Sequence, residues 1–399
     1  MTPPLVIALV GQSWGNAESG GATFENEILH AVLTTPSAHR FIVYPTSRRL
    51  AAFVSEAGLG ERVTLLKAIR TPRLPSRVAR RSVRFLLRRR APLPFGALSA
   101  LLRDKGAQCA WLTGGALVPL DMPYVATIWD TQHRVQPWFP EVSEKGEWRE
   151  RERLYSELVG RASAVLVGTS AGAEEIRSAY GDAAGAIQVV PLPTPSFALT
   201  AGMRPRGARP ADVPPRYLFY PAQFWPHKNH VTAVRVIAEL GRSHDSPDLV
   251  CVGADKGTRD HVMAEAKALG VAHRIHMPGF VEQSRLTALY QHAEALLYPS
   301  VFGPDNLPPL EAMALGCPVV AARVRGADEQ LGLAAVLVDP YDVRGYADAL
   351  RRLRDEPHWR DALIEAGRER ARSWTPSEYV LSVFGLIQSR IAPARALWA

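Results

Sequence analysis

The chain has 399 residues, which is enough for two domains of ordinary size, each with its own hydrophobic core. Hydrophobic residues account for 47% of it and charged residues for 22%, proportions that are typical of a soluble globular protein. No apolar run approaches the length needed to cross a bilayer, so the sequence excludes a membrane-spanning protein. The formal net charge is +8, from 47 basic and 39 acidic side chains.

The first apolar run, residues 4–11, is short, lacks a basic leader and continues into polar residues. It therefore predicts a strand and not a signal peptide. Cys109, Cys251 and Cys317 lie in or beside predicted strands and show no spacing typical of metal ligands. We expect buried, reduced thiols, no structural zinc and a cytoplasmic location.

Short β-rich runs alternate with helical segments along the whole chain. In the first half these runs cover residues 5–10, 41–44, 63–66, 109–112, 124–129, 164–168 and 187–190. In the second half they cover residues 217–220, 249–252, 275–277, 295–298, 318–321 and 335–338. The alternation predicts an α/β fold of two Rossmann-like domains that face each other across a cleft, each a parallel sheet with helices on both faces.

Between the two halves lies a stretch rich in Pro, Arg, Ala and Gly, without periodicity. We expect a first domain at residues 1–195, a linker at 196–215, a second domain at 216–374 and a C-terminal helix at 375–399. In this last segment Thr375 and Glu378 form the pattern of a capping box, with Pro376 at the first helical position. The helix is amphipathic, and its apolar face consists of Tyr379, Val380, Val383, Phe384 and Ile387.

Two segments of the first half place polar or flexible residues after predicted strands. Gly20 and Gly21 open a helix, where glycine lets the backbone approach a ligand closely, although a glycine pair can equally serve only to form the turn. Residues 127–134 read TIWDTQHR at a strand end, and polar groups there project into a cleft. Asp130 and His133 are therefore candidate substrate ligands, although a lone histidine is also often structural.

The basic charge is concentrated, because residues 62–103 contain no Asp or Glu. On a helical wheel five arginines gather on one side, opposite an apolar arc: Arg77, Arg80, Arg81, Arg84 and Arg88. A basic amphipathic helix is typical of contact with an anionic membrane surface. Nucleic-acid binding would account for the charge equally well, but the arginine side of the helix lacks interleaved aromatic residues and no nucleic-acid module is recognisable, so we expect no nucleic-acid partner. A solvated basic face is the remaining alternative.

Residues 220–230 read YPAQFWPHKNH and join the first predicted strand of the second domain to a helix. From this junction Lys228 can reach a pyrophosphate and neutralise charge on a departing nucleotide. Gln223 and His227 lie close enough in sequence to assist it. The alternative is an ordinary solvated lysine in a loop.

The most informative segment, residues 301–322, reads VFGPDNLPPLEAMALGCPVVAA and predicts the loop, helix and second strand of a βαβ unit. Pro308 or Pro309 suits a first helical turn, whose unpaired N–H groups and dipole favour a phosphate. Glu311, one turn further, is suited to accept hydrogen bonds from neutral hydroxyls such as those of a ribose. The segment predicts a nucleotide diphosphate at a helix N-terminus, or else an ordinary buried βαβ unit.

The run LPPLEAMALGCPVV resembles the nucleotide-sugar signature of retaining glycosyltransferase family 4, whose members have the GT-B fold. In that family seven residues separate two glutamates, and Glu311 matches the second. Gly303 occupies the first position, and the residues after it resemble a subgroup with an FGPTN-like loop, often linked to bacterial surface polysaccharides. The resemblance implies donor contacts at Asn306 and Leu307, and Asp305 could supply the missing carboxylate.

Two further motifs of the second domain carry the same resemblance. Lys228 matches the family's phosphate-binding lysine, whereas Gln223 falls where an accompanying arginine is usual. The resemblance also implies that Gly279, Phe280 and Val281 belong to the loop that lines the base pocket and that they bind the donor.

The first domain adds two motifs. The pair Gly20 and Gly21 matches glycines that face the donor phosphate or the acceptor. Many relatives read HDLQH where this chain reads WDTQH, so Trp129 replaces the first histidine while Asp130 and His133 remain. The resemblance implies that both remaining side chains help to place the acceptor or the sugar.

As a whole, the resemblance implies a first domain that binds the acceptor, a second that binds a nucleotide sugar, and a C-terminal helix that crosses back onto the first domain. The implied reaction is retaining transfer of a hexosyl unit, such as mannosyl, to a glycan, lipid-linked at the inner face of the cytoplasmic membrane, in surface-polysaccharide biosynthesis. We expect no cofactor and no metal, because the chain has no Asp-x-Asp motif. The alternatives are a catalytically degenerate nucleotide-sugar-binding protein and, more distantly, a sugar-nucleotide epimerase.

Overall fold

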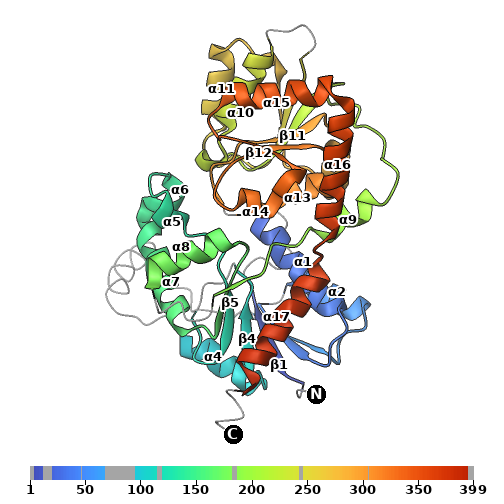
Figure 1. The fold of residues 1–399 in the computed structure, drawn as a ribbon. Coiled ribbons are helices and arrows are strands. Elements are labelled where there is room, and N and C mark those ends of the chain that lie inside the picture. The colour runs from blue at the N-terminus through green and yellow to red at the C-terminus, as the bar shows by residue number, and fades with distance from the viewer. Residues whose placement is uncertain are drawn as a thin grey trace, which may run out of the picture.

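The computed structural model describes residues 4–11, 20–45, 47–67, 95–114, 119–181, 187–241, 246–303 and 305–393. Its described residues form two parallel β-sheets, one of seven strands and one of six, each covered by helices. In Figure 1 the N-terminal domain forms the lower part of the molecule and the C-terminal domain the upper part. The predicted α/β architecture of two Rossmann-like domains is confirmed.

The N-terminal sheet has the strand order β3-β2-β1-β4-β5-β6-β7, with every neighbouring pair parallel. Its strands are β1 Val6–Val10, β2 Arg40–Tyr44, β3 Val63–Leu65, β4 Cys109–Leu112, β5 Tyr124–Thr127, β6 Ala164–Val167 and β7 Ile187–Val189. Successive side chains enter opposite hydrophobic clusters, so Ile7 and Leu9 pack on one face while Ala8 and Val10 pack on the other. Burial on both faces explains the uninterrupted apolar runs.

The C-terminal sheet has the order β10-β9-β8-β11-β12-β13 and is also parallel throughout. Its strands are β8 Tyr217–Pro221, β9 Asp248–Val252, β10 Ile275–Gly279, β11 Ala295–Tyr298, β12 Val319–Ala322 and β13 Val336–Val338. Each predicted run in both halves corresponds to one of these strands. The three cysteines are buried and unpaired, as expected: Cys109, Cys251 and Cys317.

Helices cover both sheets. Those of the N-terminal half are α1 Gly20–Thr34, α2 Arg48–Glu56, α4 Phe95–Asp104, α5 Gln132–Val135, α6 Pro140–Ser143, α7 Glu147–Arg161, α8 Ser170–Tyr180 and α9 Ser196–Gly202. Those of the C-terminal half are α10 His230–Leu240, α11 Arg259–Ala268, α12 Gln283–His292, α13 Leu307–Ala314, α14 Ala327–Leu331, α15 Val343–Asp355, α16 Pro357–Arg372 and α17 Pro376–Arg390. None among the described residues is long and apolar enough to cross a membrane.

The segment predicted as the linker contains the short helix α9, and its boundaries stay a prediction. The backbone N–H of Ser196 donates to Glu27 Oε2 at 2.8 Å, which ties the start of α9 to α1. At its other end Gly202 approaches the backbone of Ala314 so closely that an added Cβ would lie 2.1 Å from its carbonyl oxygen. This short helix is therefore stabilised by packing against both domains and not by an apolar periodicity in its own sequence.

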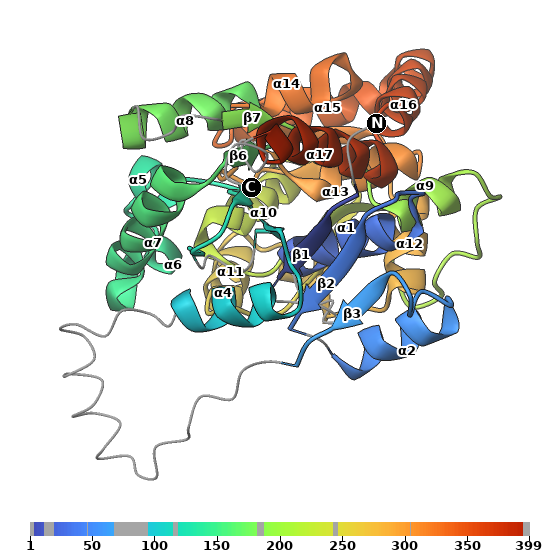
Figure 2. The ribbon, with the colours of Figure 1, turned by 90° about the horizontal axis from the view of Figure 1, so that it is seen from below.

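The C-terminal helix packs against the N-terminal domain, as predicted. Thr375 and Glu378 form a complete capping box, and Pro376 occupies the first turn of α17. The predicted apolar face is buried in the same cluster as strand residues of the N-terminal sheet: Tyr379, Val380, Val383, Phe384 and Ile387. Figure 1 shows α16 and α17 running from the upper domain down to the lower one, and α17 lies near α1 in both Figure 1 and Figure 2.

The strand orders place one crevice in each domain. Strand β1 has β2 on one side and β4 on the other, and β8 likewise lies between β9 and β11. In open parallel sheets ligands bind beyond the carboxyl ends of strands where the order reverses. The loops after β1 and β4, and those after β8 and β11, are therefore the places to look for a site. The predicted arginine-rich helix lies outside the described residues (Arg77, Arg80, Arg81, Arg84 and Arg88).

Candidate functional site

The loop after β8 carries Lys228 and is held by hydrogen bonds on both sides. The Tyr220 hydroxyl donates to the backbone carbonyl of Lys228. The next residue, Asn229, adopts a left-handed conformation with φ of 53°. Its side-chain amide donates to the carbonyls of Pro299 at 3.1 Å and Pro340 at 2.9 Å. These contacts compensate for the strained backbone and fix the position from which the lysine projects.

The ammonium group of Lys228 is surrounded by neutral oxygen atoms. Its Nζ donates to Tyr298 Oη at 3.0 Å and to Ser300 Oγ and Asn306 Oδ1, each at 3.4 Å. It forms no ion pair with any residue that the structure describes. A positive charge with only neutral neighbours, at the carboxyl ends of β8 and β11, is suited to bind a diphosphate.

Helix α13 begins at Leu307, one residue earlier than a proline-initiated helix would. Pro308 and Pro309 therefore follow in the first turn, and prolines have no N–H group. The expectation of several unpaired N–H groups at this end is corrected, since of these three residues only Leu307 has one. Asn306 precedes the helix and is fixed by Gln330, which accepts from its N–H and donates to its carbonyl, both at 2.9 Å.

Glu311 lies one turn inside α13 and is 7% exposed. Its Oε2 accepts a hydrogen bond of 2.7 Å from the Tyr290 hydroxyl. Burial raises the pKa of Glu311 to about 7, the Tyr290 hydrogen bond opposes this shift, and the negative charge of Glu27 adds to it. The carboxyl group thus changes its charge near neutral pH, which suits a group that accepts hydrogen bonds from a ligand when ionised.

Asp305 lies at the boundary between the domains. Its carboxylate packs on the backbone after β6, where a Cβ at Gly168 would lie 1.5 Å from Asp305 Oδ2. Burial, followed by the charges of Asp130, Glu329 and Glu175, raises the pKa of Asp305 to about 7. The close contact requires glycine at position 168, and it directs this candidate for the missing carboxylate toward the N-terminal domain.

The space beside the glycine pair is filled by Trp129. Gly20 and Gly21 are the first residues of α1, and an added Cβ at Gly21 would lie 2.5 Å from the Trp129 ring. Gly114, after β4, has φ of 118° and approaches the same indole as closely. Phe24 packs edge-on against it, with ring centroids 6.0 Å apart. The indole N–H is buried and has no hydrogen-bond partner among the described residues.

Asp130 and His133 have different environments. Asp130 Oδ1 accepts from the Gln132 N–H at 2.9 Å and lies 3.2 Å from the Arg151 guanidinium, while its side chain stays 27% exposed. His133 is fully buried, with Nε2 3.3 Å from Glu152 Oε2. Burial, with a smaller contribution from Arg151, lowers the pKa of His133. Its ring is enclosed against α7, and its Nδ1 has no hydrogen-bond partner in the described structure, so the substrate contact of His133 stays a prediction.

The remaining donor-site candidates lie at the carboxyl ends of β8 and β10. Gly279 ends β10 with φ of 84°, and its carbonyl accepts from the N–H of Gly253 at 2.9 Å. Phe280 is 60% exposed, whereas Val281 packs against the domain core. Gln223 accepts a hydrogen bond of 2.9 Å from the Trp225 indole. An exposed ring next to a glycine turn offers a surface on which a planar base can stack.

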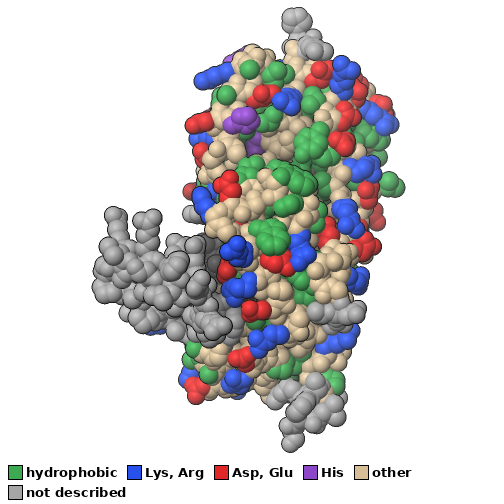
Figure 3. Space-filling model, turned by 90° about the vertical axis from the view of Figure 1, so that its left-hand side faces the viewer, with side chains coloured by type: hydrophobic (Ala, Val, Ile, Leu, Met, Phe, Trp, Pro, Cys, Tyr) green, Lys and Arg blue, Asp and Glu red, His purple; other side chains and the backbone are tan. Residues whose placement is uncertain are grey.

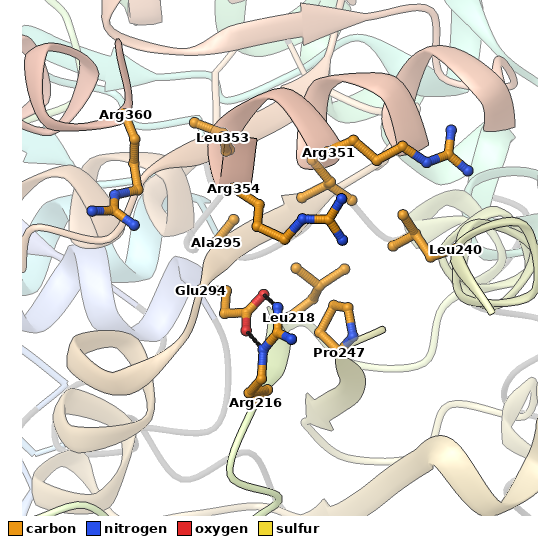
Figure 4. A pocket seen from close by; sticks show the side chains of 11 residues that line it. Arg216, Leu218, Leu240, Pro247, Glu294, Ala295, Arg351, Leu353, Arg354 and Arg360 are labelled. Carbon is orange, nitrogen blue, oxygen red and sulfur yellow. Dashed lines mark hydrogen bonds and ion pairs between the residues drawn. The ribbon is translucent and has the colours of Figure 1, made fainter. Parts of the chain in front are cut away.

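A separate pocket of about 200 Å³ lies at the opposite end of the C-terminal sheet. Figure 4 shows the ion pair between Arg216 and Glu294, which directly precede β8 and β11. Arg354 and Arg360 also line it, each paired with the aspartate that follows it in sequence. It lies at the amino ends of the strands, so it is not part of the site around Lys228.

Several residues of the site were missed by sequence reasoning. Tyr298 is the last residue of a buried strand, and its hydroxyl group at the end of an apolar run was the feature of the sequence that could have identified it. Gly114 follows a strand as Gly20 does, but only the sheet order shows that β1 and β4 are neighbours. Ser300 and Gln330 carry no recognisable pattern. No group of three or more His, Cys, Asp or Glu side chains in the described ranges is arranged to hold a metal ion.

Known proteins resemble the chain in sequence and in fold. Residues 206–370 match the family model described as "Glycosyl transferases group 1". A glycogen synthase of Mycobacterium tuberculosis is 27% identical over 271 residues, which are 66% of this chain and 63% of that protein. The chain therefore spans less than two thirds of the length of this relative.

Two solved structures share the fold over nearly the whole chain. Sucrose-phosphate synthase from Thermosynechococcus elongatus has a TM-score of 0.70 at 18% identity, covering 98% of this chain and 100% of its own. Anabaena HepE in complex with UDP and glucose has a TM-score of 0.68 at 14% identity, covering 96% of this chain and 100% of its own. The chain has the GT-B fold, and its C-terminal domain is similar to group 1 glycosyl transferases.

Proposed function

We propose that the chain is a group 1 glycosyltransferase that takes a sugar from a nucleotide diphosphate donor. The observation that carries this proposal is the environment of Lys228, whose charge is met, among the residues that the structure describes, only by neutral oxygens at the crevice between β8 and β11. The match of residues 206–370 to the family model supports it, as does the UDP in the HepE complex.

In the proposed reaction the chain mainly positions substrates and stabilises the leaving group. Negative charge grows on the diphosphate as the sugar bond breaks, and Lys228 would neutralise it. Glu311 would accept hydrogen bonds from the ribose, with Phe280 beside the base. The acceptor hydroxyl would attack on the face that the diphosphate leaves, and a phosphate oxygen would take its proton, so that configuration is retained without a metal.

The transferred unit and the acceptor are proposed from the resemblance of the FGPDN loop and from the arginine-rich segment. We propose a hexosyl unit such as mannosyl, and a lipid-linked glycan of a surface polysaccharide as acceptor, at the inner face of the cytoplasmic membrane. Binding to liposomes that depends on acidic lipid and weakens with salt would support this location. The variant with glutamine at five positions should then lose liposome binding but keep turnover: Arg77, Arg80, Arg81, Arg84 and Arg88.

Incubation with a panel of nucleotide sugars tests the activity. An enzyme should release free nucleotide slowly by hydrolysis, and faster with an acceptor, and the panel would identify its donor. NMR of the product linkage should show the donor's anomeric configuration, and inversion would contradict a retaining mechanism.

A catalytically degenerate nucleotide-sugar-binding protein is the second candidate. Two substitutions favour it, because Gly303 replaces the first glutamate of the family motif and Trp129 fills the space beside Gly21. Binding of a nucleotide sugar without any turnover would select this candidate.

A further inference from the structure

The N-terminal domain holds the two loops that surround Lys228 through a short segment around α6. Glu141 of α6 contacts the loop after β8, and Gln136, which follows α5, contacts the loop after β11. Figure 1 places α5 and α6 on the left, where the lower domain reaches up to the upper one, and Figure 3 views this side. The segment follows the TIWDTQHR motif directly in the chain, but it lies far in sequence from the motifs that carry Lys228 and Glu311.

Glu141 is bound by the residue next to the lysine. Its Oε1 lies 3.1 Å from the backbone nitrogen of His227, which donates to it, and 2.5 Å from ring Nδ1. Its side chain is 7% exposed, and the other oxygen, Oε2, is buried without a hydrogen-bond partner in the described structure. A buried carboxylate with an unpaired oxygen is a poor source of stability, so its presence requires another explanation.

Aromatic rings pack around this contact. The His227 ring stacks on Phe302, with centroids 4.0 Å apart and planes 10° apart. Phe139, from the N-terminal domain, meets Phe302 edge-on at 5.0 Å. Burial lowers the pKa of His227 to about 4, with Glu141 opposing the shift and Lys228 adding to it. A neutral ring at physiological pH can donate one N–H to Glu141 and leaves Lys228 as the positive charge beside it.

The same segment also holds the second loop. The Gln136 side-chain amide donates to the carbonyl of Val301 at 2.9 Å. Val301 in turn donates its N–H to the carbonyl of His227 at 2.9 Å, which joins the two loops to each other. Lys228 projects from one loop and two of its neutral neighbours, Ser300 and Asn306, come from the other. A shift of either loop would therefore separate the ammonium group from its neighbours.

We propose that Glu141 is a positioning residue that sets the place of Lys228 when the two domains are closed, with Gln136 as its counterpart on the second loop. Through this contact the domain on the acceptor side of the crevice determines the geometry of the charge that stabilises the leaving group. The inference rests on the proposed function, because it assigns Lys228 to the departing diphosphate. It adds a residue for which no sequence motif exists.

The test compares Glu141→Ala and Glu141→Gln with Glu174→Ala as control. Glu174, whose side chain is 62% exposed, pairs with Arg325 across the same domain boundary at 2.6 Å, and this contact does not touch either loop. Loss of hydrogen bonds to a charged group should lower kcat/KM of Glu141→Ala roughly tenfold to a hundredfold, with a smaller loss in Glu141→Gln. The control should remain within about twofold of wild type, as expected for an exposed ion pair.

A double-mutant cycle separates positioning from general destabilisation. If Glu141 acts through Lys228, Glu141→Ala should have almost no further effect on turnover in a Lys228→Ala background. If the double variant instead loses turnover by the product of the two single effects, the proposal is overturned. Wild-type kcat/KM in Glu141→Ala would overturn it as well. The affinity for UDP and GDP, measured by calorimetry, should change less than kcat, because base and ribose contacts lie elsewhere.

Amide hydrogen exchange gives a readout that does not depend on activity. Glu141→Ala should speed exchange in residues 226–230 and 299–303 relative to both wild type and Glu174→Ala, since both loops lose their support. Unchanged exchange in these loops would overturn the inference even for an active enzyme. A wild-type chain without turnover on any nucleotide sugar, but with this exchange pattern, would overturn the proposed function and leave Glu141 without the positioning role.

Discussion

Replacing Glu311 by glutamine should stabilise the chain at alkaline pH. In the wild type, burial raises the pKa of Glu311 from its ordinary value of 4.5 to about 7, the Tyr290 hydrogen bond opposes the shift, and Glu27 adds to it. The folded chain therefore keeps the proton at pH values where the unfolded chain has released it. Between about pH 4.5 and pH 7 the folded state binds more protons, so the free energy of unfolding falls as pH rises.

The difference between the two pKa values corresponds to about 3 kcal/mol of stability, present below the lower value and lost above the upper one. Glutamine has a similar shape, stays neutral at every pH and can still accept from the Tyr290 hydroxyl. Relative to wild type, Glu311→Gln should gain most of that amount between pH 5 and pH 8. The same variant should bind the donor more weakly, since an amide oxygen is a weaker acceptor for hydroxyls than a carboxylate.

Urea unfolding of both proteins at pH 5 and pH 8 measures the effect. Glu365→Gln is the matched control, because this glutamate on α16 has a side chain that is 68% exposed. The control should follow wild type, while the curve of Glu311→Gln should be flatter in pH. If wild type and Glu311→Gln lose stability in parallel, the carboxyl group does not titrate near neutral pH and the reasoning about its burial is wrong.

Three further predictions concern other parts of the molecule. Lys228→Ala should lower turnover on the order of a hundredfold or more in a steady-state assay, because it removes a preorganised charge; wild-type turnover would remove Lys228 from the mechanism. Gly114→Ala should lower the free energy of unfolding by about 2 kcal/mol, because the new Cβ would lie 2.5 Å from the Trp129 indole. The double variant Gly114→Ala/Trp129→Ala should lack that clash, so its loss of stability should be smaller than the sum of the losses in the two single variants. Losses that simply add would contradict the clash. Tyr379→Ala should destabilise the N-terminal domain by about 3–5 kcal/mol, measured by denaturant unfolding, because the ring packs against Phe24 at 5.6 Å and Trp111 at 6.1 Å.

The sequence by itself predicted the parts of the fold that depend on local patterns. Strand β4 has the predicted ends, and the capping box of α17 formed as expected, because burial on both faces and a terminal hydrogen-bond pattern leave a record in a few adjacent residues. Lys228 and Glu311 were found for the same reason, since each stands in a short motif between a strand and a helix. Their roles remain predictions.

Tertiary structure alone decided which side chains face one another across the molecule. Sequence could not tell that His133, in the short helix α5, is enclosed against α7, since tertiary packing decides which helix covers it. Nor could it pair Glu141 with His227, which lie 86 positions apart. Contacts of this kind form only when two folded domains meet. The physical reason is that a residue pattern in a short stretch of sequence reflects local backbone geometry and burial, and carries no information about a partner so distant in the chain.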